Sequence, residues 1–236
     1  MNTINPVIND AMLAWPQWDH NGFNFRQTCL QQMATKLVFD EPSIKAVFEY
    51  HLQAACQNQA PQVMPGPTGE TNELYLAARG VALIYVESDN LTLSAQQGVV
   101  AQIAAALIAG NTLVVCCEDL TFNQVLLNAA QDCIPAHLLN FVAKDKLMDV
   151  AVAQVSCCGY VGSKHGAIEL NRALVKKEGA IVVGNFEVLD ANSDSEALKL
   201  ALDPNLYLGF VTERTRTINV TAIGGNATLL ELGADH

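Results

Sequence analysis

The sequence predicts an α/β fold with a Rossmann-like parallel sheet, a helical N-terminal segment and a protruding C-terminal β-arm. Residues 81–86 read VALIYV, a continuous apolar run that is typical of a strand covered on both faces. Similar runs alternate with capped helical patterns up to about residue 188, which favours parallel strands joined by right-handed crossovers. Near the C-terminus apolar residues recur with period two, which predicts an extended strand. We therefore expect three regions: helical residues 1–60, an α/β domain at 61–190, and a linker helix, arm and terminal motif at 191–236.

The first region shows apolar spacing of i, i+3 and i+4 over residues 25–37 and 43–56, with Pro42 at the start of the second helix. Residues 57–72 are rich in proline and glycine and predict a loop. Trp15 and Trp18 place two large amphipathic rings close together, either as an interface anchor or as a cover for the sheet edge.

Predicted strands and helices alternate along the α/β region. Gly110 and Asn111 form a C-terminal cap pair for a helix over 93–109, and Thr121 can cap a helix over 123–131. A further helix, over 164–177, ends at Gly179. The strands that we expect after residue 86 are 113–117, 140–143, 151–159 and 180–183.

The C-terminal region begins with a polar linker at 190–196 and a helix over 194–202. The expected arm spans Leu206–Ala222 and carries Thr, Glu and Arg on both faces of its middle, so no core covers it there. A turn at 224–226 then redirects the chain into an apolar tail. Such an arm leaves unpaired strand edges, which are prone to pair with another chain. We therefore expect the arm to dock onto another chain.

Charge and cysteine content exclude several classes of protein. The net charge is −11, with 24 acidic and 13 basic residues, so nucleic acid and anionic membrane are poor partners. No apolar run reaches transmembrane length, and no signal segment opens the chain. The 7 cysteines lack zinc-ligand spacing and a secreted context, so we expect reduced thiols in a cytoplasmic protein.

One turn is a candidate cofactor site. Gly162, Ser163 and Gly166 stand between a predicted strand and a predicted helix, where free amides attract phosphate. Because the spacing is not G-x-G-x-x-G, an ordinary strand-to-helix turn is the favoured interpretation from spacing alone. Asp89, Glu118 and Asp119 follow strand ends where α/β sheets bind ligands, and we interpret them as helix N-caps.

The sequence offers weak candidates for a nucleophile or a metal ligand. Cys116 and Cys117 have no cationic neighbour in sequence, whereas Cys157 and Cys158 stand near Lys164 and His165 and could be weakly activated. Core packing remains the favoured role for both pairs. The histidines show no metal spacing, so no catalytic or metal-binding residue is assigned.

Several motifs, in order along the chain, resemble the aldehyde dehydrogenase superfamily. They are residues 78–82 (ARGVA), 104–115 (AAALIAGNTLVV) and 160–163 (YVGS). Two others, 65–72 (PGPTGETN) and 213–227 (ERTRTINVTAIGGNA), are similar to segments of the bifunctional proline-utilisation enzymes, PutA, which combine proline dehydrogenase and 1-pyrroline-5-carboxylate dehydrogenase. The resemblance implies a free-standing version of PutA's C-terminal aldehyde-dehydrogenase-like domain, which is non-catalytic in long members and covers the cavity between the two active sites.

The departures from the superfamily bear on activity. Its Lys-Pro-x-Glu motif, which holds the adenosine ribose, would fall on residues 116–119, where the lysine is replaced by Cys116. The Trp-Asn-Phe-Pro loop is replaced near residues 88–91, the Glu-Leu-Gly-Gly-Lys segment survives only as a remnant at 184–187, and no cysteine stands in a Gly-Gln-x-Cys context.

We therefore expect no cofactor, or at most weak NAD binding at Gly162, Ser163 and Gly166, and a non-catalytic scaffold or channel-covering role in proline catabolism. The alternative is an NAD-dependent 1-pyrroline-5-carboxylate dehydrogenase, which converts glutamate semialdehyde to glutamate. The expected assembly is a homodimer through the β-arm, with a proline-utilisation enzyme as a second possible partner.

Overall fold

The computed structural model describes residues 6–147, 154–189 and 198–219. The chain divides into two compact units. The first comprises Met1–Asn58 and Ala77–Thr212, and the second comprises Gln59–Leu76 and Glu213–His236. Each unit is described by itself.

The first unit is built on a five-stranded parallel sheet with the order β5-β4-β3-β6-β7. This confirms the predicted Rossmann-like sheet. Successive strands run outward from β3 to β5, and β6 and β7 then lie on the other side of β3. The strand order therefore reverses between β3 and β6, and open α/β sheets bind ligands at such a switch point, beyond the carboxyl ends of the strands. The bounds are β3 (Val81–Val86), β4 (Thr112–Cys116), β5 (Leu139–Val142), β6 (Cys157–Gly162) and β7 (Val183–Val188).

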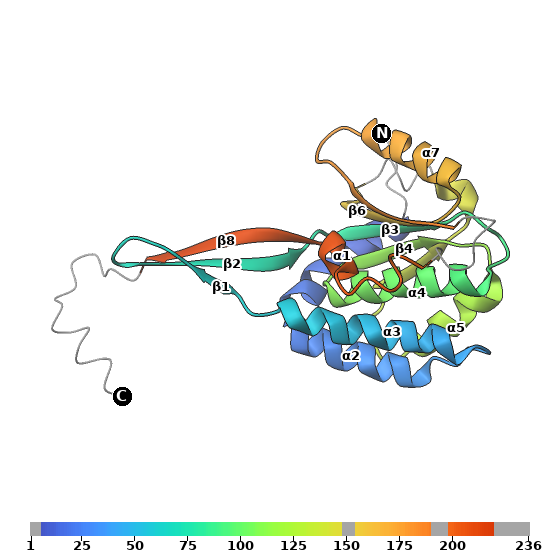
Figure 1. Cartoon of the computed structure of the whole chain (residues 1–236), viewed down its shortest axis with the longest axis horizontal. Coiled ribbons are helices and arrows are strands. Elements are labelled where there is room, and N and C mark those ends of the chain that lie inside the picture. Colours follow the sequence, from blue (N-terminus) through green and yellow to red (C-terminus); the bar gives the residue numbers. More distant parts are fainter. Residues whose placement is uncertain (1–5, 148–153, 190–197, 220–236) are drawn as a thin grey trace. The chain divides into compact units, whose positions relative to one another are not determined.

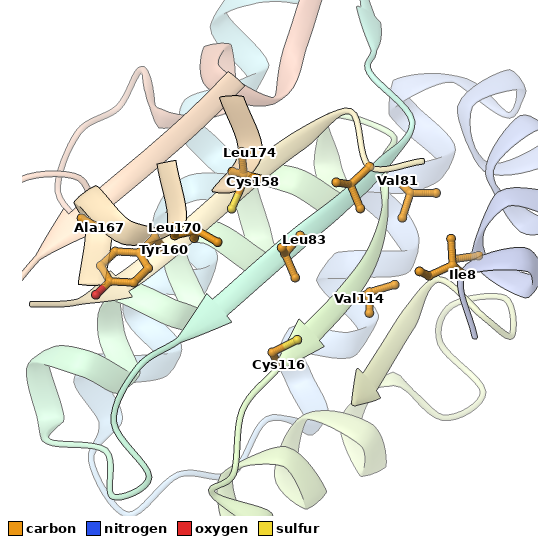
Figure 2. Close-up of a cluster of buried hydrophobic side chains, with 12 residues drawn as sticks. Ile8, Val81, Leu83, Val114, Cys116, Cys158, Tyr160, Ala167, Leu170 and Leu174 are labelled. Carbon is orange, nitrogen blue, oxygen red and sulfur yellow. The ribbon is translucent and has the colours of Figure 1, made fainter. Parts of the chain in front are cut away.

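Helices cover both faces of this sheet (Figure 1). On one face, α1 (Pro6–His20) packs over β3, β4 and β5, and α7 (Lys164–Val175) packs over β6 and β7. Figure 2 shows side chains from both helices, such as Ile8 and Leu170, meeting buried residues of β3, β4 and β6. On the opposite face, α4 (Leu93–Ile108) lies against the sheet beneath α2 (Gly22–Lys36) and α3 (Pro42–Ala54), while α5 (Leu120–Ala130) contacts β5 and α2.

The C-terminal end of α4 is held by side chains from the N-terminal helices. Gly110 has φ +98°, the left-handed conformation of a helix C-terminal glycine, as the sequence predicts. The indole of Trp18 donates a 3.0 Å hydrogen bond to Leu107 O, and Arg26 Nε donates one of 3.0 Å to Ile108 O. Leu107 O also accepts a 3.0 Å hydrogen bond from Gly110 N, so the two side chains add donors to carbonyls in the last turn of the helix.

The two tryptophans differ in their surroundings. Trp18 is 1% exposed and therefore belongs to the core of its own unit. Trp15 is only partly buried. Of the two interpretations left open by the sequence, an interface anchor is wrong for Trp18.

A buried asparagine joins three segments of the first unit. Asn111 is fully buried, and its Oδ1 accepts hydrogen bonds from Arg79 N (2.9 Å) and Gly80 N (3.0 Å). Its Nδ2 donates to Ala106 O (3.1 Å) and Phe210 O (2.9 Å). The sequence predicts Asn111 only as part of a helix cap, whereas its side chain also joins the start of β3 to Phe210.

Several predicted boundaries are wrong. The strand expected at 151–159 is β6, which begins at Cys157, although 151–153 lie outside the described residues. The strand expected at 180–183 is β7, which begins at Val183. Both true strands contain glycine, and glycine in a sequence is usually a sign of a turn. Here Gly159 is required because its Cβ would stand 1.8 Å from Gln102 Oε1 on α4.

The second unit contains a three-stranded sheet with the order β1-β2-β8, formed by β1 (Gln62–Met64), β2 (Glu70–Ala78) and β8 (Val211–Asn219). The loop expected over 57–72 is therefore wrong in part, since it contains β1 and the start of β2. Polar contacts hold β8 to β2: Arg216 Nε donates to Glu73 Oε2 at 3.0 Å, and Thr217 Oγ1 donates to Asn72 Oδ1 at 2.6 Å. Residues 213–219 are all exposed, as expected for an arm without a core.

The arm begins later than predicted. Residues Leu206–Phe210 form a 3₁₀ helix, η3, rather than a strand. Its buried side chains are Leu206, Tyr207 and Phe210, so the burial has helical spacing rather than period two. The remaining apolar residue, Leu208, is 42% exposed. The predicted helix over 194–202 lies partly outside the described residues, and residues 198–202 form turns. The expected arm residues 220–222 and the turn at 224–226 also lie outside them.

Candidate functional site at the carboxyl edge of the parallel sheet

The candidate turn lies at the switch point of the sheet. Gly162 ends β6, and Ser163 is the N-cap of α7, with its hydroxyl accepting a 3.1 Å hydrogen bond from Gly166 N. Glu87 follows β3 directly, and β3 pairs with β6 in parallel. The end of the central strand therefore lies beside the N-terminus of α7.

The carboxylate of Glu87 occupies this turn. It accepts a hydrogen bond from the backbone amide of Ser163 and a second, 3.1 Å long, from the Ser163 hydroxyl. The phenol of Tyr160 lies 2.7 Å from Glu87 Oε2 and 2.9 Å from Ser163 O. The side chain thus takes up the hydrogen-bond donors that a bound anion would use at a helix N-terminus.

Glu87 is ionised in this arrangement. Burial by itself would raise the pKa of Glu87, but the hydrogen bonds from Tyr160 and Ser163 outweigh it and hold the pKa below its ordinary value. Burial, together with the neighbouring carboxylate, raises the pKa of Tyr160. At neutral pH a neutral phenol therefore faces a charged carboxylate.

The glycines of the turn make room for these two groups. A Cβ at Gly162 would stand 2.5 Å from the Tyr160 hydroxyl and 2.6 Å from Glu87 Oε2. A Cβ at Gly166 would stand 2.3 Å from the same hydroxyl and 2.6 Å from Glu87 Oε1. Space that would admit a phosphate in a nucleotide-binding turn is thus filled by side chains of the chain itself.

A lysine beyond β5 connects the neighbouring strand ends. Lys144 Nζ donates to the main-chain oxygen of Glu87 and to the carboxylate of Asp89. Its backbone amide donates a 2.6 Å hydrogen bond to Glu118 Oε1. The carboxyl ends of β3, β4 and β5 are therefore linked by direct contacts.

The acidic residues predicted to be N-caps have different roles. Asp119 is the N-cap of α5, accepting from Phe122 N at 2.9 Å, so that prediction is confirmed and the proposed Thr121 cap is wrong. Asp89 and Glu118 instead contact Lys144, and α4 is capped by Thr92. Asp119 is also where the superfamily's ribose-binding carboxylate would fall, and here this carboxylate caps a helix.

The thiols of the two adjacent cysteine pairs, 116–117 and 157–158, are buried, and their pKa values are raised. Burial raises the pKa of Cys116 to about 12, of Cys117 to about 11 and of Cys157 to about 12. Burial also raises the pKa of Cys158, whose side chain lies in the apolar cluster of Figure 2. The weak activation suggested for Cys157 and Cys158 is therefore wrong, because both side chains are fully buried. The exposed thiol is Cys56, which lies on η1 (Ala55–Asn58).

In the described parts of the chain, histidine, cysteine and acidic side chains do not gather into a group that could hold a metal ion. His51 is buried and its Nε2 lies 2.8 Å from Ala201 O. Burial lowers the pKa of His51, so the ring is neutral and structural at neutral pH.

Comparison with solved structures identifies the class of fold. The chain has the Rossmann-like α/β fold of aldehyde-dehydrogenase type. It is similar to a proline utilization A (PutA) structure with proline bound in remote sites, at 22% identity and a TM-score of 0.67, over 78% of this chain and 21% of that one. The match to PutA from Bdellovibrio bacteriovorus has 14% identity and a TM-score of 0.66, over 77% and 22% of the two chains.

PnpE from Pseudomonas sp. WBC-3 is also similar, at 18% identity and a TM-score of 0.61, over 83% of this chain and 46% of that one. This chain thus corresponds to about a fifth of the PutA length and less than half of PnpE. No protein-family model and no curated protein matches the sequence. Over residues 6–147, 154–189 and 198–219, no helix combines the length and apolar character needed to span a bilayer.

The sequence predicts the turn, but it does not predict the contacts that Glu87, Tyr160 and Lys144 make at this edge of the sheet. One signal was available for Glu87, since an acidic residue directly after the most apolar strand must lie at the carboxyl edge of the sheet. Tyr160 and Lys144 gave no such signal, because their contacts depend on which strands are neighbours.

Proposed function

We propose that this chain is a non-catalytic, aldehyde-dehydrogenase-like domain of proline catabolism that acts as an oligomerisation scaffold or channel-covering partner of a proline-utilisation enzyme. The observation that carries the proposal is the burial of the thiols in the two adjacent cysteine pairs. Aldehyde oxidation by this class of fold requires a thiolate nucleophile. The thiols of Cys116, Cys117, Cys157 and Cys158 are buried, with raised pKa values. The likeness of fold to PutA supports the pathway.

The alternative is an NAD-dependent 1-pyrroline-5-carboxylate dehydrogenase. In its favour, a structure of PnpE in complex with nicotinamide adenine dinucleotide shares the fold, with a TM-score of 0.62 and 18% identity. Against it, the turn at Gly162, Ser163 and Gly166 holds Glu87, and the carboxylate of Asp119 caps a helix.

An activity assay distinguishes the two functions. The purified chain is mixed with NAD and glutamate semialdehyde, and NADH is followed by absorbance. We expect no NADH above a protein-free control, because no strand thiol is available as a thiolate at neutral pH. NADH formation would overturn the non-catalytic proposal, and its loss in Cys157→Ser or Cys158→Ser would then name the nucleophile.

The β-arm is the proposed docking element, and the partner that we propose first is a second copy of this chain. β8 is an edge strand of its sheet, and its residues 213–219 are exposed. Exposed edges pair readily with another strand, and a two-fold dimer would supply one arm to each partner.

Light scattering of the full chain and of a chain ending at Thr212 tests this assembly. The shortened chain retains η3, whose Tyr207 and Phe210 are buried, so the first unit keeps its core. We expect a dimer for the full chain and a monomer for the shortened one. If both the full and the shortened chain are monomers, the arm is not an oligomerisation device. If both are dimers, the dimer interface lies outside the arm. A pull-down with a proline-utilisation enzyme then tests the second partner.

A further inference from the structure

We infer that Glu87 is a built-in anion that excludes phosphate-bearing ligands from the switch point of the parallel sheet. This inference concerns the exclusion of ligands and goes beyond the scaffold role. The inference rests on the position of the Glu87 carboxylate. This carboxylate lies at the N-terminus of the 12-residue helix α7, beside the end of β6, where the strand order of the parallel sheet reverses.

The carboxylate uses the same groups that would hold a phosphate. The amide and the hydroxyl of Ser163 both donate to Glu87. The partial positive charge of a helix N-terminus stabilises one negative group at close range, and here that group is supplied by the chain. An incoming phosphate would meet a like charge and find these donors already engaged.

Two contacts keep the carboxylate in place. Lys144 holds the main chain of Glu87 through its carbonyl oxygen, and the phenol of Tyr160, a fully buried residue, lies against the carboxylate. A covalently tethered group has a high effective concentration, on the order of millimolar or more. A free phosphate ligand at lower concentration cannot displace it.

The test uses the full chain with inorganic pyrophosphate and, separately, NAD as probes, measured by calorimetry. We expect weak or undetectable binding to the wild type and at least tenfold tighter pyrophosphate binding to Glu87→Ala. Adding Ser163→Ala to that variant should remove the gain, because the hydroxyl donor and the helix cap are lost. Glu169→Ala is the matched control, since it removes a carboxylate from the same helix α7, where Glu169 contacts Arg172 and not the turn.

Circular dichroism establishes whether Glu87→Ala is folded. If it is not, Glu87→Gln provides the test, since it keeps the size of the side chain and removes its charge, and a gain of at least threefold is expected. Equal binding by the wild type and a folded variant would overturn the inference, as would micromolar pyrophosphate binding by the wild type or an equal gain in Glu169→Ala. These outcomes are independent of dimer formation and of NADH production, so they leave the proposed function to its own tests.

Discussion

Replacing Asn111 with alanine is expected to lower the free energy of unfolding by about 3–5 kcal/mol. The amides of Arg79 and Gly80 would lose their acceptor, and Phe210 O would lose its donor, inside a core where Asn111 is fully buried. Each buried polar group left without a partner costs about 1–3 kcal/mol. Because small domains are stable by only about 5–15 kcal/mol, this single change approaches the limit of folding.

Urea denaturation of the full chain measures the effect. Asn140→Ala is the matched control, because Asn140 also donates two hydrogen bonds, to Leu113 O and His137 O, but is only partly buried. A loss of about 1 kcal/mol is expected for the control. Equal losses in the two variants would show that the burial of Asn111 has no special role.

Asn111 also shows how far local sequence predicts this fold. The pair Gly110-Asn111 is a good signal for the end of a helix, and α4 does end there. The bond from Asn111 to Phe210 O spans 99 positions in the sequence. Local patterns cannot reveal a contact of that range, since it depends on how the strands and helices assemble.

The other elements also divide into those that local sequence predicts and those that depend on long-range packing. The continuous apolar runs at 81–86 and 113–117 predict β3 and β4 to within one residue at each end, because a strand buried on both faces is apolar along its whole length. The segment 206–210 was mispredicted because alternate apolar residues fit a strand as well as a turn of 3₁₀ helix. Packing decides between the strand and the 3₁₀ helix. The segment η3 contacts α4 and β7, and its side chains Leu206, Tyr207 and Phe210 are all buried.

At the candidate site, the sequence predicts the turn and the sheet edge, but it does not predict that Glu87 occupies the turn. Glycines at 162 and 166 fit a phosphate and an internal carboxylate equally well, since both require close approach to the backbone. The pairing of β3 with β6 is what brings Glu87 to Ser163. That neighbour relation follows from strand order, which no local motif encodes.

The burial of Trp18 leads to the second large expected effect. Trp18→Ala should lower the free energy of unfolding by about 3–5 kcal/mol, because removal of a buried tryptophan leaves a cavity. It would also leave Leu107 O without its indole donor and remove the edge contact with Phe25, whose ring centroid is 6.3 Å away. Trp18→Phe keeps most of the volume and loses the hydrogen bond, so a loss of about 1–2 kcal/mol is expected.

The chain has 2 tryptophans, so fluorescence separates their roles. Trp15→Ala is the matched control, since Trp15 lies on the same helix but is partly exposed, and its expected cost is below 2 kcal/mol. In Trp15→Ala the remaining emission comes from Trp18 and should be blue-shifted, then move to the red on unfolding in urea. Equal destabilisation by Trp15→Ala and Trp18→Ala would contradict this assignment, because the cost follows from burial and Trp18 is the more deeply buried of the two.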